Sequence, residues 1–263
     1  MTTIPLAVEL PLTQDLGPCG SLSINPYRAC DIRCAYCITG AQGPSVPRFA
    51  RAEVAERLHA ELAEVGHLHD RLTVGTLCDA YPSVEAELGV TRAVLEALTT
   101  VDRTVSIVTK GLTIERDADL LARDGWRATI SLTALDDAVV ARLEPHAPSS
   151  LDRLALVHRL HDAGITVAVS VTPWIPDATD AEALIERVDP AIPVTIGPLN
   201  VRMPEVARTG FGQRFRQAEI NDAYLDAWRR STPRPNVTWL VPIPDDGHAD
   251  QDACHPFTAL GAS

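Results

Sequence analysis

The sequence predicts an α/β fold in which a parallel sheet, covered by helices on its outside, curls into a partial or full barrel. Strand-like and helix-like segments alternate about six times along the 263 residues, a pattern typical of parallel sheets with right-handed crossovers. The hydrophobic content of 46% is enough for a sizeable core. No run of about 18 apolar residues occurs, so we expect no membrane span.

The individual elements follow from apolar periodicity and from breakers. We predict strands at 21–25, 71–77, 104–109, 127–132, 165–172 and 194–199, with a short last strand at 237–241. Helices are expected at 52–65, 87–98, 114–123, 151–163, 181–188 and 215–230. The first of these repeats apolar residues at helical spacing, namely Val54, Leu58, Leu62 and Val65. Glycines end two helices, at Gly125 and Gly164.

The chain divides into three parts by composition. Residues 1–20 contain Pro5, Pro11 and Pro18 and are expected to form an irregular N-terminal leader. Residues 21–235 hold the alternating elements and form the barrel. Residues 236–263 are expected to add a strand and a tail that covers the barrel mouth.

The net charge and the number of cysteines limit which binding partners and which cellular compartment the sequence allows. The formal net charge is −12, and phosphate contacts need clustered Lys and Arg, so binding to nucleic acid is disfavoured. The N-terminus lacks the basic and apolar regions of a secretory signal, and six cysteines fit a reducing cytoplasm. We therefore expect a cytoplasmic protein.

Three cysteines form the most informative motif, Cys30-x3-Cys34-x2-Cys37. Thiolates this close can hold one inorganic centre, and iron–sulfur clusters are usually held by four. Three ligands on a cubane cluster would leave one iron open to an outside molecule. Structural zinc normally needs a second Cys/His pair, which does not follow at the right distance. A disulfide framework suits short secreted chains, and clustered unliganded cysteines are rare.

These residues carry a resemblance to a known family. The cysteine motif, with Tyr36 inside it, resembles the cluster loop of the radical S-adenosylmethionine (radical SAM) superfamily. The preceding Asn25-Pro26-Tyr27 is similar to the spore photoproduct lyase branch. The resemblance implies a partial (β/α)6 TIM-like barrel and a 4Fe–4S cluster on Cys30, Cys34 and Cys37. It also implies that the open iron binds S-adenosylmethionine, whose reductive cleavage yields a 5′-deoxyadenosyl radical.

The reacting groups of such barrels lie at the carboxyl ends of the strands. At the end of the second predicted strand stands the segment Gly75-Thr76-Leu77-Cys78-Asp79-Ala80-Tyr81. The resemblance implies that Thr76 and Asp79 lie near the amino group of S-adenosylmethionine, although Ala80 replaces the family's proline. Cys78 is either a small buried thiol in a turn or a hydrogen donor to the radical, offset by one residue from the lyase's cysteine.

Later strand ends supply further candidates for binding S-adenosylmethionine. Lys110 is the only lysine in the chain and follows the third strand, where an ammonium would suit a carboxylate. The resemblance places Lys110 beside the cofactor carboxylate, Ser131 at its ribose or carboxylate, and Ile175 against its adenine. Arg153 either pairs with Glu144 or reaches the cofactor carboxylate.

The leading hypothesis is a radical SAM enzyme, a lyase, isomerase or oxidoreductase, acting on a small-molecule or nucleoside-like substrate. It would take electrons from an external one-electron reductant such as flavodoxin or ferredoxin. Two alternatives stay open: repair of a DNA lesion in the manner of spore photoproduct lyase, and a non-catalytic Fe–S or zinc module with a redox or structural role.

Overall fold

The computed structural model describes residues 12–15, 21–40, 42–65 and 69–242. Its centre is an eight-stranded sheet with the strand order β1 to β8. The strands are β1 (Thr13–Asp15), β2 (Ser21–Ile24), β3 (Arg71–Val74), β4 (Thr104–Thr109), β5 (Trp126–Ser131), β6 (Val167–Trp174), β7 (Val194–Pro198) and β8 (Val237–Trp239). β2 to β8 are parallel to their neighbours, and β1 is antiparallel to β2.

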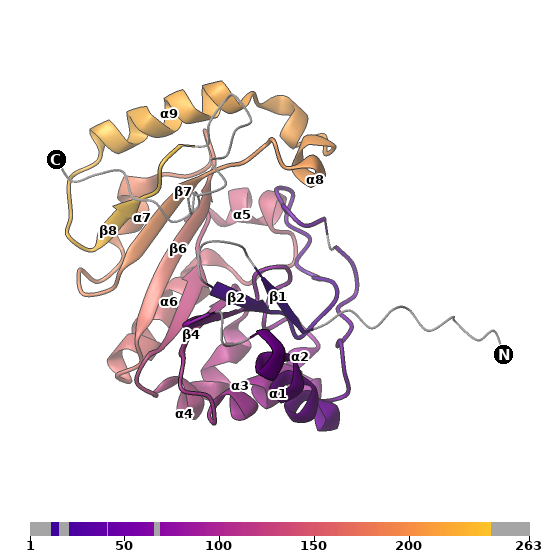
Figure 1. Cartoon of the computed structure of the whole chain (residues 1–263). Coiled ribbons are helices and arrows are strands. Elements are labelled where there is room, and N and C mark those ends of the chain that lie inside the picture. The colour runs from indigo at the N-terminus through magenta and orange to yellow at the C-terminus, as the bar shows by residue number, and fades with distance from the viewer. Residues whose placement is uncertain (1–11, 16–20, 41, 66–68, 243–263) are drawn as a thin grey trace.

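Helices follow most of these strands. They are α1 (Val54–Val65), α2 (Glu85–Leu88), α3 (Val90–Leu98), α4 (Ala118–Leu121), α5 (Asp137–Leu143), α6 (Ser150–Asp162), α7 (Ala181–Glu186), α8 (Pro204–Ala207) and α9 (Gln217–Arg230). Short 3-10 helices occupy Arg51–Glu53, Leu112–Asp117 and Gly212–Arg214. Figure 1 shows α1 to α4 near the N-terminal half of the sheet and α9 alongside β7 and β8.

The predicted α/β fold with an unclosed parallel sheet is confirmed. β1 and β8 are not hydrogen-bonded to each other, so the barrel remains open among the described residues. The short predicted strand near 237–241 is β8, which continues the parallel order next to β7.

One expectation was wrong, because we expected residues 1–20 to be irregular throughout. Within them, Thr13–Asp15 form β1 and pair with Ser23 and its neighbours on β2. Glu61 on α1 holds this strand by accepting hydrogen bonds from Leu12 N (2.9 Å) and Thr13 N (2.7 Å). A three-residue strand has too few residues for a periodic pattern, which is why the sequence does not reveal it. The expected tail lies largely outside the described residues.

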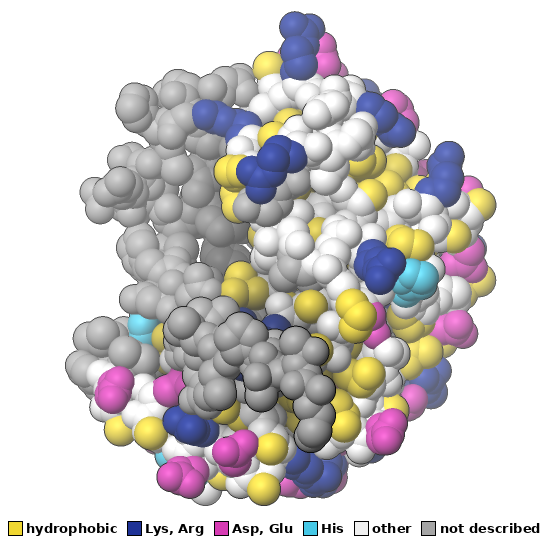
Figure 2. All heavy atoms as spheres, turned by 90° about the vertical axis from the view of Figure 1, so that its right-hand side faces the viewer, with side chains coloured by type: hydrophobic (Ala, Val, Ile, Leu, Met, Phe, Trp, Pro, Cys, Tyr) yellow, Lys and Arg dark blue, Asp and Glu magenta, His cyan; other side chains and the backbone are white. Residues whose placement is uncertain are grey.

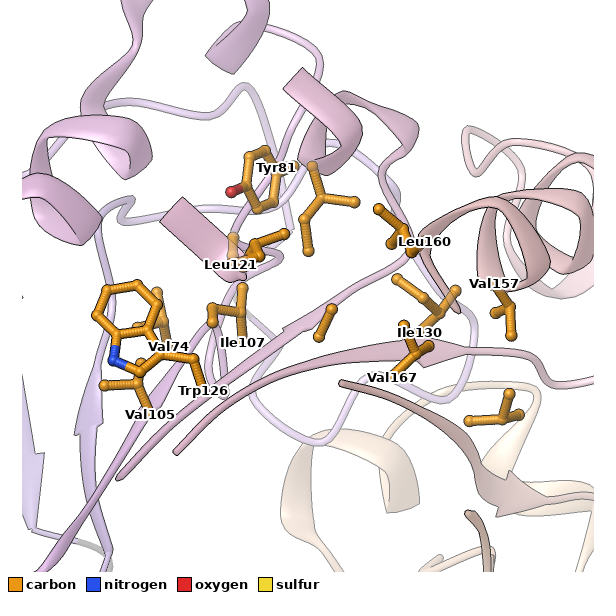
Figure 3. Close-up of a cluster of buried hydrophobic side chains, with 14 of the residues drawn as sticks. Val74, Tyr81, Val105, Ile107, Leu121, Trp126, Ile130, Val157, Leu160 and Val167 are labelled. Carbon is orange, nitrogen blue, oxygen red and sulfur yellow. The ribbon is translucent and has the colours of Figure 1, made fainter. Parts of the chain in front are cut away.

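The two faces of the sheet differ in chemistry. Side chains alternate across a strand, and one set is apolar and buried beneath the helices. Figure 3 shows part of this core, including Val74, Tyr81, Val105, Ile107, Leu121, Trp126, Ile130, Val157, Leu160 and Val167. The alternate positions are rich in hydroxyl groups and half-buried, among them Thr73, Ser106, Thr129, Ser170 and Thr195. The sheet therefore has one apolar face and one polar face.

None of the helices in the described ranges is both long enough and apolar enough to cross a bilayer.

Candidate functional site

The three motif cysteines lie on the loop between β2 and α1, which we call the cysteine loop (residues 25–50). Its first and last segments, residues 26–28 and 46–48, form two paired arms, since Arg28 N donates to Val46 O (2.9 Å) and Arg48 N donates to Pro26 O (2.9 Å). The middle of the loop is held to α5, because Ala35 N donates to Leu143 O (2.8 Å). In Figure 1 this loop runs down one side of the molecule, and Figure 2 shows the same side with hydrophobic, basic and acidic side chains interspersed. The two ends of the loop are therefore tied to each other, and its centre is tied to α5.

The thiols of Cys30, Cys34 and Cys37 are free and partly exposed. Burial raises the pKa of Cys34 to about 12, an effect that the nearby Lys110 ammonium opposes. Among the described residues, no three His, Cys, Asp or Glu side chains are close enough to hold a single metal ion. A donor set of three thiols nevertheless has the ligand chemistry of an iron–sulfur cluster, for which cysteine thiolates are the usual ligands. The residues thus fit such a cluster by their chemistry.

Cys78 adds a fourth thiol, just beyond the end of β3. Its side chain is buried, and burial together with the charges of Cys30 and Cys37 raises its pKa to about 12. Cys78 therefore lies within electrostatic range of Cys30 and Cys37.

Lys110 directly follows β4, and its side chain extends to Tyr36 of the cysteine loop. Its Nζ lies 3.9 Å from Glu144 Oε1 and 5.9 Å from the centre of the Tyr36 ring. Burial lowers the pKa of Lys110, but the negative charges of Cys34, Glu144 and Asp79 outweigh it, so the pKa is raised. A charged ammonium therefore stands beside the cysteine loop.

Asp79 joins the ends of β3 and β4. Its carboxylate accepts hydrogen bonds from Lys110 N (2.7 Å), Tyr81 N (2.9 Å) and the Thr109 hydroxyl. Thr76 shares a short hydrogen bond with the Ser23 hydroxyl, which also accepts from Asn25 Nδ2 (2.8 Å). Both predicted residues therefore lie at this end of the barrel, and the carboxylate of Asp79 positions the backbone of Lys110.

Arg153 and Ser131 lie behind Lys110. Arg153 Nη2 lies 2.8 Å from Glu144 Oε2, although the two groups lack the alignment of a hydrogen bond, and Nη1 donates to Ser131 O (2.8 Å). Both charged side chains are fully buried. Of the two roles considered for Arg153, the structure shows the pair with Glu144.

Two polar residues absent from the predicted site complete it. Thr133 donates to Glu144 Oε1 (2.6 Å), and the Tyr36 hydroxyl donates to the same oxygen. Burial would raise the pKa of Glu144, but Lys110, Arg153 and these hydroxyls together lower it. The available signal for Tyr36 was its position between two motif cysteines, and the signal for Thr133 was its place among the hydroxyl-bearing residues at the end of the fourth predicted strand.

Ile175 lies just beyond β6 and is 1% exposed. It belongs to a second apolar cluster that also contains Tyr36, Leu143 and Leu199. The structure thus connects Ile175 to the cysteine loop through Tyr36, within a packed cluster.

Comparisons with known proteins agree with this arrangement. Residues 24–188 match the family model described as the radical SAM superfamily. An uncharacterized protein of Mycobacterium bovis is 26% identical over 202 residues, covering 72% of this chain and 57% of the relative. One of Methanocaldococcus jannaschii is 23% identical over 192 residues, covering 71% and 73%. The chain thus spans little more than half the length of the mycobacterial relative.

Solved structures with the same fold include three kinds of protein. Streptococcus suis SuiB bound to S-adenosylmethionine superposes with a TM-score of 0.57 at 15% identity, over 89% of this chain and 51% of SuiB. A radical SAM methyltransferase from Sphaerobacter thermophilus gives 0.54 at 19% identity, over 90% and 69%. Spore photoproduct lyase complexed with dinucleoside spore photoproduct gives 0.53 at 15% identity, over 70% and 60%.

The family model spans the cysteine loop and the strand ends that carry Asp79, Lys110 and Ser131. The chain therefore belongs to the radical SAM superfamily, whose cofactors are a 4Fe–4S cluster and S-adenosylmethionine.

Proposed function

We propose that this chain is a radical SAM enzyme that abstracts hydrogen from a small-molecule or nucleoside-like substrate. Cys30, Cys34 and Cys37 would hold the cluster. Lys110, Thr76, Asp79, Ser131, Arg153 and Ile175 would bind or position S-adenosylmethionine. When bound, these cofactors supply a 5′-deoxyadenosyl radical, and an external one-electron carrier such as flavodoxin or ferredoxin supplies the electron.

The observation that carries the proposal is the position of Lys110. The only lysine of the chain lies at a strand end, 3.9 Å from a buried carboxylate and in electrostatic contact with Cys34. An ammonium here can bind the carboxylate of S-adenosylmethionine. Asp79 supports this role because it fixes the Lys110 backbone.

The polar face of the sheet favours a hydrogen-bonding substrate. Ser131 pairs in register with Ser170, and Ser170 with Thr195, so their hydroxyls share one face. Hydroxyls both donate and accept hydrogen bonds, which suits the groups of a sugar or nucleoside.

Anaerobic reconstitution with iron and sulfide tests the proposal. We expect a brown protein with about four irons per chain that converts S-adenosylmethionine to 5′-deoxyadenosine when dithionite is added. Substituting Cys30, Cys34 or Cys37 by alanine should abolish both properties, while Cys78→Ala should retain the cluster. A colourless zinc protein, or a cluster in the Cys34→Ala variant equal to that of the wild type, would instead favour a non-catalytic module.

Repair of a DNA lesion is the second candidate, because spore photoproduct lyase shares the fold. Against it stands the net charge of −12. Salt-dependent binding to a lesion-bearing oligonucleotide would support repair, and the absence of such binding would favour the small-molecule substrate.

We also propose that residues 21–235 form the catalytic unit, and that residues 236–263 add a strand and a tail that covers the barrel mouth.

A further inference from the structure

Two arginines of the cysteine loop, Arg28 and Arg48, lie beside each other on its paired arms. The backbone pairing of these arms brings the two residues together, and Arg28 Nη2 donates to Arg48 O (3.4 Å). Both side chains are half-buried. Two positive charges are therefore held next to each other in a partly desolvated position.

Neither guanidinium has an acidic partner among the described residues. Arg28 Nε, Arg48 Nε and Arg48 Nη1 are buried and donate no hydrogen bond, and neither arginine forms an ion pair within the described ranges. Glu61 acts electrostatically on Arg48 but already accepts three hydrogen bonds from Leu12 and Thr13.

Such an arrangement is costly for the protein alone. A buried donor without an acceptor loses its hydration and gains nothing in return, and like charges side by side repel. The pKa of Arg48 is lowered, chiefly by burial and further by the charge of Arg28, while Cys78 and Glu61 oppose the shift. An anion between the two guanidinium groups would supply the missing acceptors and neutralise the repulsion.

The pair also lies close to the candidate active site. The guanidinium of Arg48 acts on the buried Cys78 thiol, which in turn is close to Cys30 and Cys37. Arg28 is two residues from Cys30. An anion held between the two guanidinium groups would thus lie close to Cys78.

We propose that Arg28 and Arg48 form an oxyanion-binding site that anchors a phosphate or carboxylate group of the substrate next to Cys78. Guanidinium groups bind both anions through paired N–H donors. This proposal rests on the proposed function and narrows its substrate class to anionic small molecules, such as a nucleotide or a carboxylic acid. The negative charge of the chain as a whole would keep extended polyanions away, so the site selects a single anionic group.

Direct binding tests the site without turnover. Inorganic phosphate and acetate are titrated separately into the reconstituted enzyme by calorimetry, and the thermal unfolding midpoint is followed in parallel. The variants are Arg28→Gln and Arg48→Gln. Arg33→Gln is the matched control, because Arg33 is exposed on the same loop and its substitution by glutamine removes the same charge.

We expect one of the two anions to bind the wild type and Arg33→Gln equally, and to bind Arg28→Gln and Arg48→Gln at least about tenfold more weakly. The preferred anion tells phosphate from carboxylate substrates. It should also raise the unfolding midpoint of the wild type, a measurement that stands even where a variant fails to fold. Equal binding by all four proteins, or no binding of either anion below about 10 mM, overturns the proposal. Formation of 5′-deoxyadenosine with dithionite tests the proposed function separately.

Discussion

Arg153 Nη2 lies 2.8 Å from Glu144 Oε2, with both side chains completely buried. Lys110 approaches the other oxygen of the same carboxylate at 3.9 Å, on the side of the cysteine loop. Glu144 therefore links a cation inside the protein to the cation that faces the proposed cofactor. Its loss should be felt both in stability and in the position of Lys110.

Replacing Glu144 by alanine should destabilise the protein by about 3–5 kcal/mol, because Arg153 would be left as a buried unpaired charge. The measurement is the free energy of unfolding in urea. Glu115→Ala is the control, since the Glu115–Arg159 pair is exposed and should contribute at most about 1 kcal/mol. If the two variants lose the same free energy of unfolding, the buried pair contributes no more to stability than the exposed pair.

The same residue predicts how stability depends on pH. Because the pKa of Glu144 is lowered in the folded protein, its contribution is complete above its unfolded pKa of about 4.3 and is lost as pH falls towards the folded value. Urea midpoints between about pH 7 and pH 3 should therefore fall more steeply for the wild type than for Glu144→Gln. Parallel curves would contradict this assignment.

Replacing Lys110 by methionine should weaken binding of S-adenosylmethionine to the reconstituted enzyme at least about tenfold, because a charge-assisted contact is removed. Equilibrium dialysis with labelled cofactor measures the affinity. Arg142→Met, which removes an exposed cation of α5, should leave it unchanged. If both variants bind the cofactor like the wild type, Lys110 is not a cofactor contact.

The thiol of Cys78 should resist alkylation in protein prepared without the cluster. With its pKa raised to about 12 and its side chain 4% exposed, only about one molecule in ten thousand carries the thiolate at pH 8. Peptide mass spectrometry after iodoacetamide treatment at rising pH should find Cys78 modified slowly, with a strong increase towards pH 11. Rapid modification at pH 8 would mean that this region opens.

If Cys78 is a hydrogen donor, Cys78→Ala should still form 5′-deoxyadenosine while losing the final product of the substrate reaction. Cys78→Ser, which keeps the size of the side chain but holds its hydrogen more strongly, should behave like Cys78→Ala. Normal product formation by either variant would leave Cys78 as a buried thiol of the turn.

The sequence alone predicted the α/β fold and indicated the centre of the candidate site, because both signals depend on local spacing. Alternating segments predicted the parallel sheet, and three cysteines within eight residues predicted the cluster loop. Lys110 was identified from composition, because it is the only lysine in the sequence. Such signals lie within one segment and need no knowledge of its neighbours.

Only the tertiary structure showed which side chains meet. Glu144 lies 108 residues from Tyr36 along the chain, yet it accepts a hydrogen bond from the Tyr36 hydroxyl. Likewise, only the packing shows that Arg28 and Arg48 lie together without an acidic partner among the described residues. Whether a charge is paired or left alone depends on how distant segments pack together, and no pattern within a single segment contains that information.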